Sequence, residues 1–254
     1  MTIIATRENG YLLLELNDGG NAFTHENLDL LTTWIEQAEM DRSVRSIILS
    51  SKTKVFSVGG HLNQMMDGVK DGHPSRYVEE IVPKINKVIL AISKSKLPFI
   101  CALNGTAAGG GMSLFLIGDY RISSMKGKLY TAFGDLALTP DSGSSVLMRH
   151  RMPKLGFMEF AKSTFIDSQK LLDLGGANML CEPEELLPKA KEIAASILFL
   201  DPYAVSQSKK FANRELIASL EKYLEEEYTS IVEGCKRPEF QKRLSAVIEK
   251  LTKS

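Results

Sequence analysis

The sequence predicts an α/β fold in which a mostly parallel sheet with helical crossovers is followed by a helical C-terminal region. Short apolar runs typical of buried strands, such as Ser46–Ser50 and Phe99–Leu103, alternate with stretches of helical periodicity. Strands separated by helices form parallel sheets with crossover connections. From about Ser144 onward the strand patterns give way to helices. This last part either caps the core or mediates oligomerisation.

Composition limits the classes of function. The 254 residues are 44% apolar, so the chain can bury one large core. Its 31 basic and 31 acidic side chains balance, which argues against nucleic acid or a membrane surface as a partner. The cysteines Cys101, Cys181 and Cys235 lie too far apart for a zinc motif or a disulfide framework, so we expect buried thiols and no metal. The N-terminus lacks a signal-peptide pattern, which predicts a cytoplasmic location.

The N-terminal region is expected to begin with a β-hairpin. Strands at Ile3–Arg7 and Tyr11–Leu16 flank Asn9-Gly10, which is a hairpin turn signal. Thr24 is a suitable cap for the helix that follows. The apolar residues of that helix recur at helical spacing: Leu28, Leu31, Ile35 and Ala38. After the strand at Ser46–Ser50 we expect a loop over residues 51–68.

Strands and helices continue to alternate in the middle of the chain, and helices follow toward its end. A helix at about Tyr77–Ser95 is expected to stop before Pro98, and the strand FICAL follows. The segment AAGGGMSLFLIG opens with glycines and continues as an apolar helix, and DYRISS and KLYTA are typical of short strands. The later helices are predicted at Ser144–Arg151, Leu155–Lys162, Ser168–Leu174, Glu184–Phe199, Pro202–Ala212, Glu215–Glu233 and Glu239–Leu251.

Two glycine-rich turns follow buried strands, at Val55–Leu62 and at Asn104–Leu116. In open parallel sheets, ligands bind at the carboxyl ends of the strands. Glycines there expose backbone N–H groups without side-chain obstruction. The spacing fits neither a phosphate loop nor a dinucleotide-binding turn. Two readings stay open: close helix–strand packing, or an oxyanion hole with one N–H group from each loop.

These segments together resemble the crotonase, or enoyl-CoA hydratase/isomerase, superfamily. The similar parts occur in family order from about Ile3 to Phe211: Asn21-Ala22-Phe23, FSVGGHL, PFICALNGTAAGGGMSL, FGDLALTPDSGSS and Pro202–Lys210. The resemblance implies a crotonase-like ββα spiral core, expected over residues 1–200, and a helical trimerisation region over residues 201–254. It also implies a homotrimer or a dimer of trimers in fatty acid (lipid) metabolism. The substrate would be an acyl-CoA thioester, with coenzyme A entering as part of the substrate and no separate cofactor.

The resemblance also implies roles for single residues. The oxyanion N–H donors fall on Gly60 and Gly110. The coenzyme A moiety and its acyl chain would contact Ala22, Val58, Gly59, His61, Leu62 and Phe133. The family commonly has Ala-Gly-Ala-Asp in the first loop, where this chain has Val58-Gly59-Gly60-His61. The backbone donor does not depend on the side chain, whereas the acidic side chain is lost.

Hydratases of this superfamily use two glutamates, and this chain has neither. Ser113 and Phe133 occupy the corresponding positions. Neither side chain acts as an acid or base near pH 7, so hydration is not expected. His61 is the nearest titratable alternative, although a lone loop histidine is usually just solvated.

The remaining carboxylate is Asp141, in the sequence LTPDSG. Judged on its own, this stretch is ordinary turn chemistry. Single-base isomerases of the superfamily, however, place Glu or Asp directly after this proline. The resemblance therefore implies that Asp141 is the general base of an enoyl-CoA isomerase that moves a Δ3 double bond to Δ2. Burial against apolar residues would raise its pKa toward the working pH.

Other functions stay open at this stage. Aspartate at this turn also suits other crotonase reactions, such as dehalogenation of an aryl thioester or decarboxylation. Dehalogenation is less favoured, since the only tryptophan, Trp34, lies in the first helix. A non-catalytic, trimeric acyl-thioester-binding protein is the third class. A serine hydrolase is excluded at Ser113, which lies outside any G-x-S-x-G motif.

Overall fold

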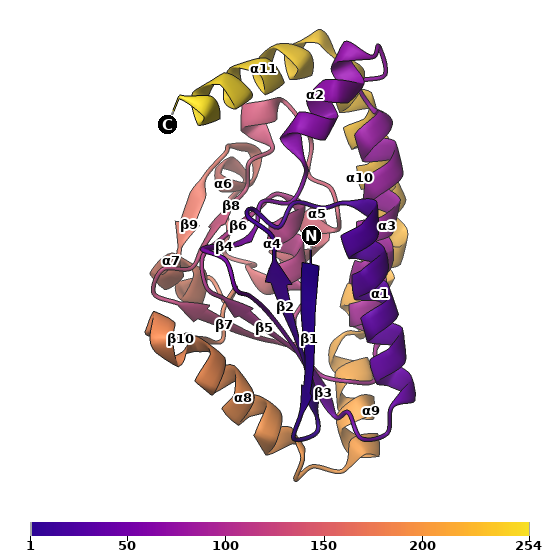
Figure 1. The fold of residues 1–254 in the computed structure, drawn as a ribbon, viewed down its shortest axis with the longest axis vertical. Helices are drawn as coiled ribbons and strands as arrows, with labels where there is room; N and C mark the ends of the chain where they lie inside the picture. The colour runs from indigo at the N-terminus through magenta and orange to yellow at the C-terminus, as the bar shows by residue number, and fades with distance from the viewer. Residues whose placement is uncertain (1, 254) are drawn as a thin grey trace.

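The computed structural model describes residues 2–253. It contains two β-sheets, and the chain passes repeatedly from one sheet to the other (Figure 1). The larger sheet has the strand order β1-β2-β3-β5-β7-β10. Its strands are β1 (Thr2–Glu8), β2 (Tyr11–Asn17), β3 (Ser46–Ser51), β5 (Phe99–Leu103), β7 (Tyr120–Ser124) and β10 (Met179–Cys181). Only the β1–β2 hairpin is antiparallel, and the other neighbours pair in parallel. The α/β class and the mostly parallel sheet are confirmed.

The smaller sheet has the order β4-β6-β8-β9. Its strands are β4 (Val55–Ser57), β6 (Thr106–Ala108), β8 (Lys128–Tyr130) and β9 (Phe165–Asp167). Strands β4, β6 and β8 follow β3, β5 and β7 directly in the chain and pair in the same order. The backbone therefore passes three times from the large sheet into the small one, and the connections between passes include α2–α3 and α4. This is the repeated ββα arrangement that the resemblance implied.

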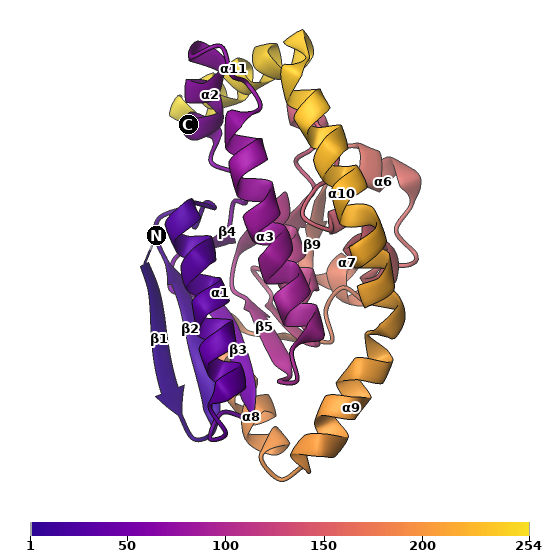
Figure 2. The same ribbon diagram turned by 90° about the vertical axis from the view of Figure 1, so that its right-hand side faces the viewer.

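Both faces of the large sheet are buried. Successive side chains along a strand point to opposite faces and so belong to two different hydrophobic clusters. In β3, Ile47 and Leu49 face one hydrophobic cluster, whereas Ile48 faces the other. Helix α8 (Leu186–Ile197) covers the smaller cluster and contacts β3, β5 and β7. Helices α1 (His25–Met40) and α3 (Arg76–Lys94) lie on the opposite face (Figure 2). Thr24 caps α1 as expected, within a capping box completed by Asn27.

The remaining helices agree with the sequence pattern in most places. They are α2 (Leu62–Lys70), α4 (Gly110–Leu116), α5 (Ser144–Arg151), α6 (Phe157–Ala161), α7 (Ser168–Asp173), α9 (Pro202–Ala212), α10 (Arg214–Lys236) and α11 (Pro238–Thr252). Two 3-10 turns occur, η1 (Gly134–Leu136) and η2 (Pro183–Glu185). The expected loop over residues 51–68 is wrong, because β4 and most of α2 lie there. Strands β6, β9 and β10 were not predicted, and the expected helix at Glu184–Phe199 is divided between η2 and α8.

The C-terminal helices pack onto the spiral of their own chain. Helix α10 lies along α3, and α11 contacts α2 and η1 at one end of the molecule (Figures 1 and 2). Lys209 on α9 is buried, with its ammonium 2.7 Å from Asp119 and donating to the carbonyl groups of Ile92 and Leu97. A division of the chain at residue 200 stays a prediction. The three cysteines are free and buried, as expected.

Within residues 2–253, no helix combines the length and the apolar character that crossing a bilayer requires.

Candidate active site

The two glycine-rich loops contact each other backbone to backbone. Gly59 has a left-handed φ of 72°, which favours glycine. A Cβ atom added to it would lie 2.6 Å from the carbonyl oxygen of Ala108 and 3.0 Å from the nitrogen of Gly110. The carbonyl group of Gly59 accepts a 2.7 Å hydrogen bond from the N–H group of Phe23, and Ala22 bridges to Gly59. The pairing of β4 with β6 therefore brings both predicted loops to one place.

The two expected oxyanion donors lie on these touching loops. Among residues 2–253, the N–H group of Gly60 has no hydrogen-bond acceptor. Gly110 is the first residue of α4, and the N–H groups of a first helical turn have no acceptor within the helix. Two free N–H groups at one place can stabilise a negatively charged oxygen. Since glycines also permit close packing, the function of this pair stays a prediction.

A buried tyrosine fixes the first loop. The Tyr77 hydroxyl donates a 2.8 Å hydrogen bond to the carbonyl oxygen of Phe23 and accepts one of 2.8 Å from the N–H group of His61. Burial is the main reason why the pKa of this phenol is strongly raised, so it stays neutral. From the sequence, Tyr77 is expected only as the start of a helix, and its contact with the first loop is not predicted.

The LTPDSG turn lies against the second loop. Ser142 and Gly143 both have left-handed backbone angles, with φ of 55° and 74°. Two such residues in succession make a sharp turn directly after Asp141. A Cβ atom added to Gly110 would lie 2.9 Å from the hydroxyl oxygen of Ser142. The Ser142 hydroxyl donates a 3.2 Å hydrogen bond to the Asp141 carboxylate. Asp141 is thus next in sequence to a residue that touches Gly110.

The electrostatic environment of Asp141 is unusual for an aspartate. Burial, followed by the charge of Glu227, raises the pKa of the Asp141 carboxyl group from 3.8 to about 7, while the hydrogen bond from Ser142 opposes the change. A carboxylate with a pKa near neutral is a better base than an ordinary aspartate and is still partly ionised near pH 7. Perturbed carboxyl groups of this kind are typical of functional sites.

Glu227 also lies at this turn, although the sequence pattern does not predict it there. It lies on α10, is 7% exposed, and accepts hydrogen bonds from the N–H groups of Gly143 and Ser145. A signal was present in the sequence. Glu227 continues the buried face of α10, on which the apolar residues are Leu220, Leu224 and Ile231. A charged residue in such a stripe needs a specific partner.

The two positions at which hydratases of the family have glutamates are buried and uncharged here. Ser113 is fully buried on α4, and its hydroxyl oxygen has no hydrogen-bond partner in the described part of the chain. Phe133 is 7% exposed and belongs to the main hydrophobic core. Neither position supplies an acid or a base.

The other expected contact residues surround the first loop. The Nδ1 atom of His61 accepts a 3.4 Å hydrogen bond from the N–H group of Gln64, so this side chain caps α2. Val58 is 40% exposed, and its N–H group donates to the carbonyl oxygen of Gly20. Leu62 is the first residue of α2. Binding of coenzyme A by these residues stays a prediction.

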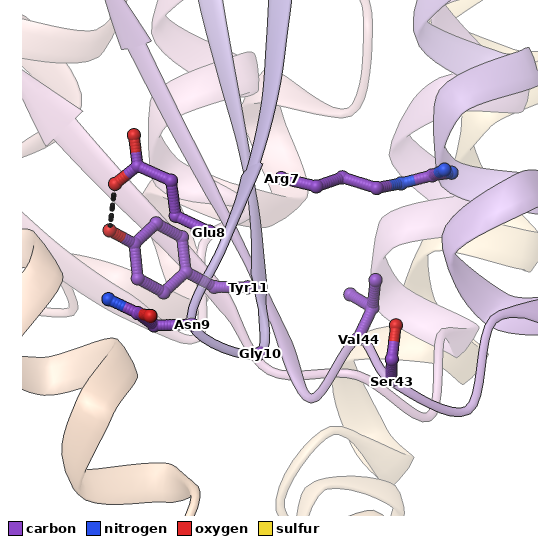
Figure 3. A pocket seen from close by; sticks show the side chains of 7 residues that line it. All are labelled: Arg7, Glu8, Asn9, Gly10, Tyr11, Ser43 and Val44. Carbon is purple, nitrogen blue, oxygen red and sulfur yellow. Dashed lines mark hydrogen bonds between the residues drawn. The ribbon is translucent and has the colours of Figure 1, made fainter.

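A surface pocket at the β1–β2 turn is separate from this site (Figure 3). It is lined by Arg7, Glu8, Asn9, Gly10, Tyr11, Ser43 and Val44. Tyr11 and Ser46 begin the parallel strands β2 and β3, so the pocket lies at their amino ends. The glycine loops follow the carboxyl ends, where ligands of parallel sheets bind. Within residues 2–253, no group of three His, Cys, Asp or Glu side chains is arranged for a metal ion.

Comparison with known proteins identifies the family. The family model for enoyl-CoA hydratase/isomerase matches residues 6–254. A short-chain-enoyl-CoA hydratase of Clostridium acetobutylicum is 30% identical over 241 residues, covering 91% of this chain and 87% of that protein. A trans-2-decenoyl-[acyl-carrier-protein] isomerase of Streptococcus mutans is 27% identical over 187 residues, covering 72% of this chain and 71% of that protein.

The same relationship is visible in three dimensions. A crystal structure of an enoyl-CoA hydratase from Bacillus halodurans superposes with a TM-score of 0.88 at 26% identity, covering 96% of this chain and 99% of that one. The match extends over the spiral core and the C-terminal helices together. This chain belongs to the enoyl-CoA hydratase/isomerase family, the crotonase superfamily.

Proposed function

We propose that this protein is an enoyl-CoA isomerase that moves a Δ3 double bond to Δ2, with Asp141 as its single general base. The observation that supports this proposal is the contrast between three positions. Ser113 and Phe133 are buried and carry no carboxylate, whereas Asp141 has a pKa raised to about 7 beside the Gly110 loop. A site with one acid–base group suits a reaction without net change in protons or water.

In the proposed reaction the thioester oxygen accepts hydrogen bonds from the N–H groups of Gly60 and Gly110. Asp141 removes a proton from C2, and the electrons move onto the thioester oxygen to give an enolate. The two N–H groups stabilise the negative charge that develops there. The protonated Asp141 then returns the proton to C4, and the double bond moves to the C2–C3 position.

The lack of a second acid–base group at the family's catalytic positions favours this chemistry over addition of water. Phe133 and the apolar core beside it provide no group that would hold or activate a water molecule. Exclusion of water also protects an enolate intermediate from side reactions. The names of the two relatives point to different carriers, since one is named for a coenzyme A thioester and the other for an acyl carrier protein. We propose the coenzyme A thioester as the substrate.

The Asp141→Asn variant tests this function, assayed with a 3-enoyl-CoA of medium chain length. We expect isomerisation to fall by about 10²–10⁴-fold, as is usual for loss of a general base. Binding of a 2-enoyl-CoA by calorimetry should remain, because the N–H donors are unchanged. Asp67→Asn, an exposed carboxylate on α2, is the matched control and should keep wild-type activity.

Activity of Asp141→Asn within a few-fold of the wild type contradicts the single-base mechanism. A wild-type protein that binds acyl-CoA but isomerises none of it contradicts the proposed function itself. That second outcome favours a decarboxylase, a dehalogenase or a non-catalytic thioester-binding protein.

A further inference from the structure

The carboxylate of Glu227 is built into the turn that contains Asp141. Its Oε2 atom accepts a 2.7 Å hydrogen bond from the N–H group of Gly143, which lies 84 positions earlier in the chain. Its Oε1 atom accepts a 2.9 Å bond from the N–H group of Ser145 and a further bond from the Ser145 hydroxyl. Helix α5 begins here, and its N-cap residue Gly143 has no side chain to satisfy these groups. Glu227 therefore caps α5 from a different helix.

The geometry favours the ionised form of Glu227. Both carboxylate oxygens accept backbone N–H groups, and a protonated carboxyl group would turn one of these oxygens into a competing donor. The positive end of the α5 dipole also stabilises an anion at this position. Burial is the larger effect and raises the pKa of Glu227 above its ordinary value, while the bonds from Ser145 and Gly143 limit this rise.

Among residues 2–253, the titratable groups that are electrostatically coupled to Asp141 carry no positive charge. From α10 they are Glu227 and the thiol of Cys235, and from α3 the hydroxyl of Tyr77. Burial keeps the thiol and the phenol neutral. The negative charge of Glu79, on α3, also contributes to the raised pKa of the Cys235 thiol. Within residues 2–253, Glu227 is thus the one anion whose charge raises the pKa of Asp141.

We propose that Glu227 is the positioning residue of this site, which holds the Asp141–Ser145 turn in place and brings a negative charge to the turn that carries the general base. This inference rests on the proposed function of Asp141. The two buried carboxyl groups, of Asp141 and Glu227, then have different roles because their surroundings differ. Glu227 keeps its charge because backbone N–H groups stabilise it. Asp141 accepts a 3.2 Å hydrogen bond from the Ser142 hydroxyl and becomes the proton acceptor.

The test is the pH dependence of kcat/KM for isomerisation of a 3-enoyl-CoA. In the wild type we expect the rate to rise with pH through about 7, because Asp141 must lose its proton to act as a base. In Glu227→Gln the nearby charge is gone, so this rise should move to lower pH by about one unit. The plateau rate should also fall, since a weaker base accepts the proton less readily. Glu226→Gln is the matched control, because Glu226 is the neighbouring, exposed carboxylate on α10 and its profile should not move.

Glu227→Asp separates charge from position. It keeps the charge but cannot reach both N–H groups, so we expect an unmoved pH profile with a kcat lowered about tenfold and an unchanged KM. If Glu227→Gln does not fold, as judged by circular dichroism, this variant alone decides the inference. A wild-type kcat in Glu227→Asp, or an unmoved profile in a folded Glu227→Gln, overturns it. If Asp141→Asn remains active, the proposed function fails as well. If Asp141→Asn is inactive and Glu227→Gln has an unmoved profile, only the role of Glu227 is wrong.

Discussion

The hydroxyl oxygen of Tyr77 accepts a 2.8 Å hydrogen bond from the backbone N–H group of His61, the residue directly after Gly60. The same hydroxyl donates to the carbonyl oxygen of Phe23, 54 positions earlier in the chain. One buried side chain on α3 thus joins the segment before α1 to the loop with the first expected oxyanion donor. The position of the Gly60 N–H group depends on this contact.

Tyr77→Phe should therefore impair catalysis more than binding. The change removes one hydroxyl group and leaves the N–H group of His61 and the carbonyl group of Phe23 without a partner, which costs about 1–3 kcal/mol of stability. We expect kcat to fall about tenfold because the donor loop loses its alignment. Steady-state kinetics and thermal unfolding measure the two effects. Tyr223→Phe, at an exposed tyrosine on α10, is the control, and equal behaviour of both variants would contradict this role.

Gly59→Ala should damage the site through the contact between the two loops. Its φ of 72° makes alanine strained by about 1–2 kcal/mol, and the new Cβ atom would lie 2.6 Å from the carbonyl oxygen of Ala108. Gly72→Ala is the matched control, because Gly72 has a φ of 77° with open space around it. We expect similar strain in both variants, but an activity loss of about 10²-fold only in Gly59→Ala, since only there is the Gly110 donor displaced. Equal activities would show that the loops need not touch.

The sequence predicted those parts of the fold that have strong local patterns. The strands β3 and β5 are continuous apolar runs because both of their faces are buried. Strands β4 and β6 have three residues each, too few to show a period. Helix α2 was missed because it is short and has only Met65 and Gly68 buried. In each of these three cases, neighbouring strands or helices decide the local conformation.

The residues of the candidate site were likewise predicted only where a local sequence motif marks them. Gly60, Gly110 and Asp141 were identified because the resemblance locates them in recognisable motifs. Tyr77 and Glu227 were missed because their roles arise from contacts between segments that are 16 and 84 positions apart. Nothing in the local sequence around Gly143 shows that a glutamate on α10 caps the next helix. Only the buried position of Glu227 in an apolar stripe gave a hint.

Asp141→Asn should stabilise the folded protein, and more so at high pH. Between pH 3.8 and about 7 the folded protein holds a proton on Asp141 that the unfolded chain has already lost. Stability therefore falls as the pH rises through this range. With about 1.4 kcal/mol for each pKa unit, the cost approaches about 4 kcal/mol at pH 8 as an upper value, because the Asp141 side chain is partly exposed to solvent.

Thermal unfolding at pH 5 and pH 8 measures this effect. The gain in Tm of Asp141→Asn over the wild type should be larger at pH 8, and Asp67→Asn should show no such dependence. A gain that is equal at both pH values, or a loss at pH 8, would show that the Asp141 carboxyl group has an ordinary pKa.

The protein should form a homotrimer or a dimer of trimers. Large apolar side chains on α9 and just before it are exposed on the single chain: Phe199 (91%), Tyr203 (74%) and Phe211 (59%). A group of exposed aromatic residues of this size is typical of a surface that another subunit covers. Light scattering at micromolar concentration should give three or six times the mass of the chain. The mass of a monomer contradicts the prediction.

The protein should hydrate crotonyl-CoA very poorly compared with its isomerisation of a 3-enoyl-CoA. Hydration needs a water molecule that is both held and deprotonated next to the oxyanion donors. The Ser113 hydroxyl is fully buried and cannot accept the proton, because an alkoxide is inaccessible near pH 7. The Phe133 ring belongs to the hydrophobic core and excludes water from that side. Asp141 alone would have to activate the water and deliver the α-proton.

The measurement compares both reactions with the same enzyme preparation. Addition of water to crotonyl-CoA is followed by loss of the conjugated double bond, and isomerisation of a 3-enoyl-CoA by its appearance. Ser113→Glu combined with Phe133→Glu restores the two carboxylates, so hydration should rise in that variant if it folds, as circular dichroism can establish. Hydration by the wild type at a rate comparable to isomerisation contradicts the single-base site. A second acid–base group would then be required, and His61 is the first residue to replace, since it lies in the loop beside Gly60.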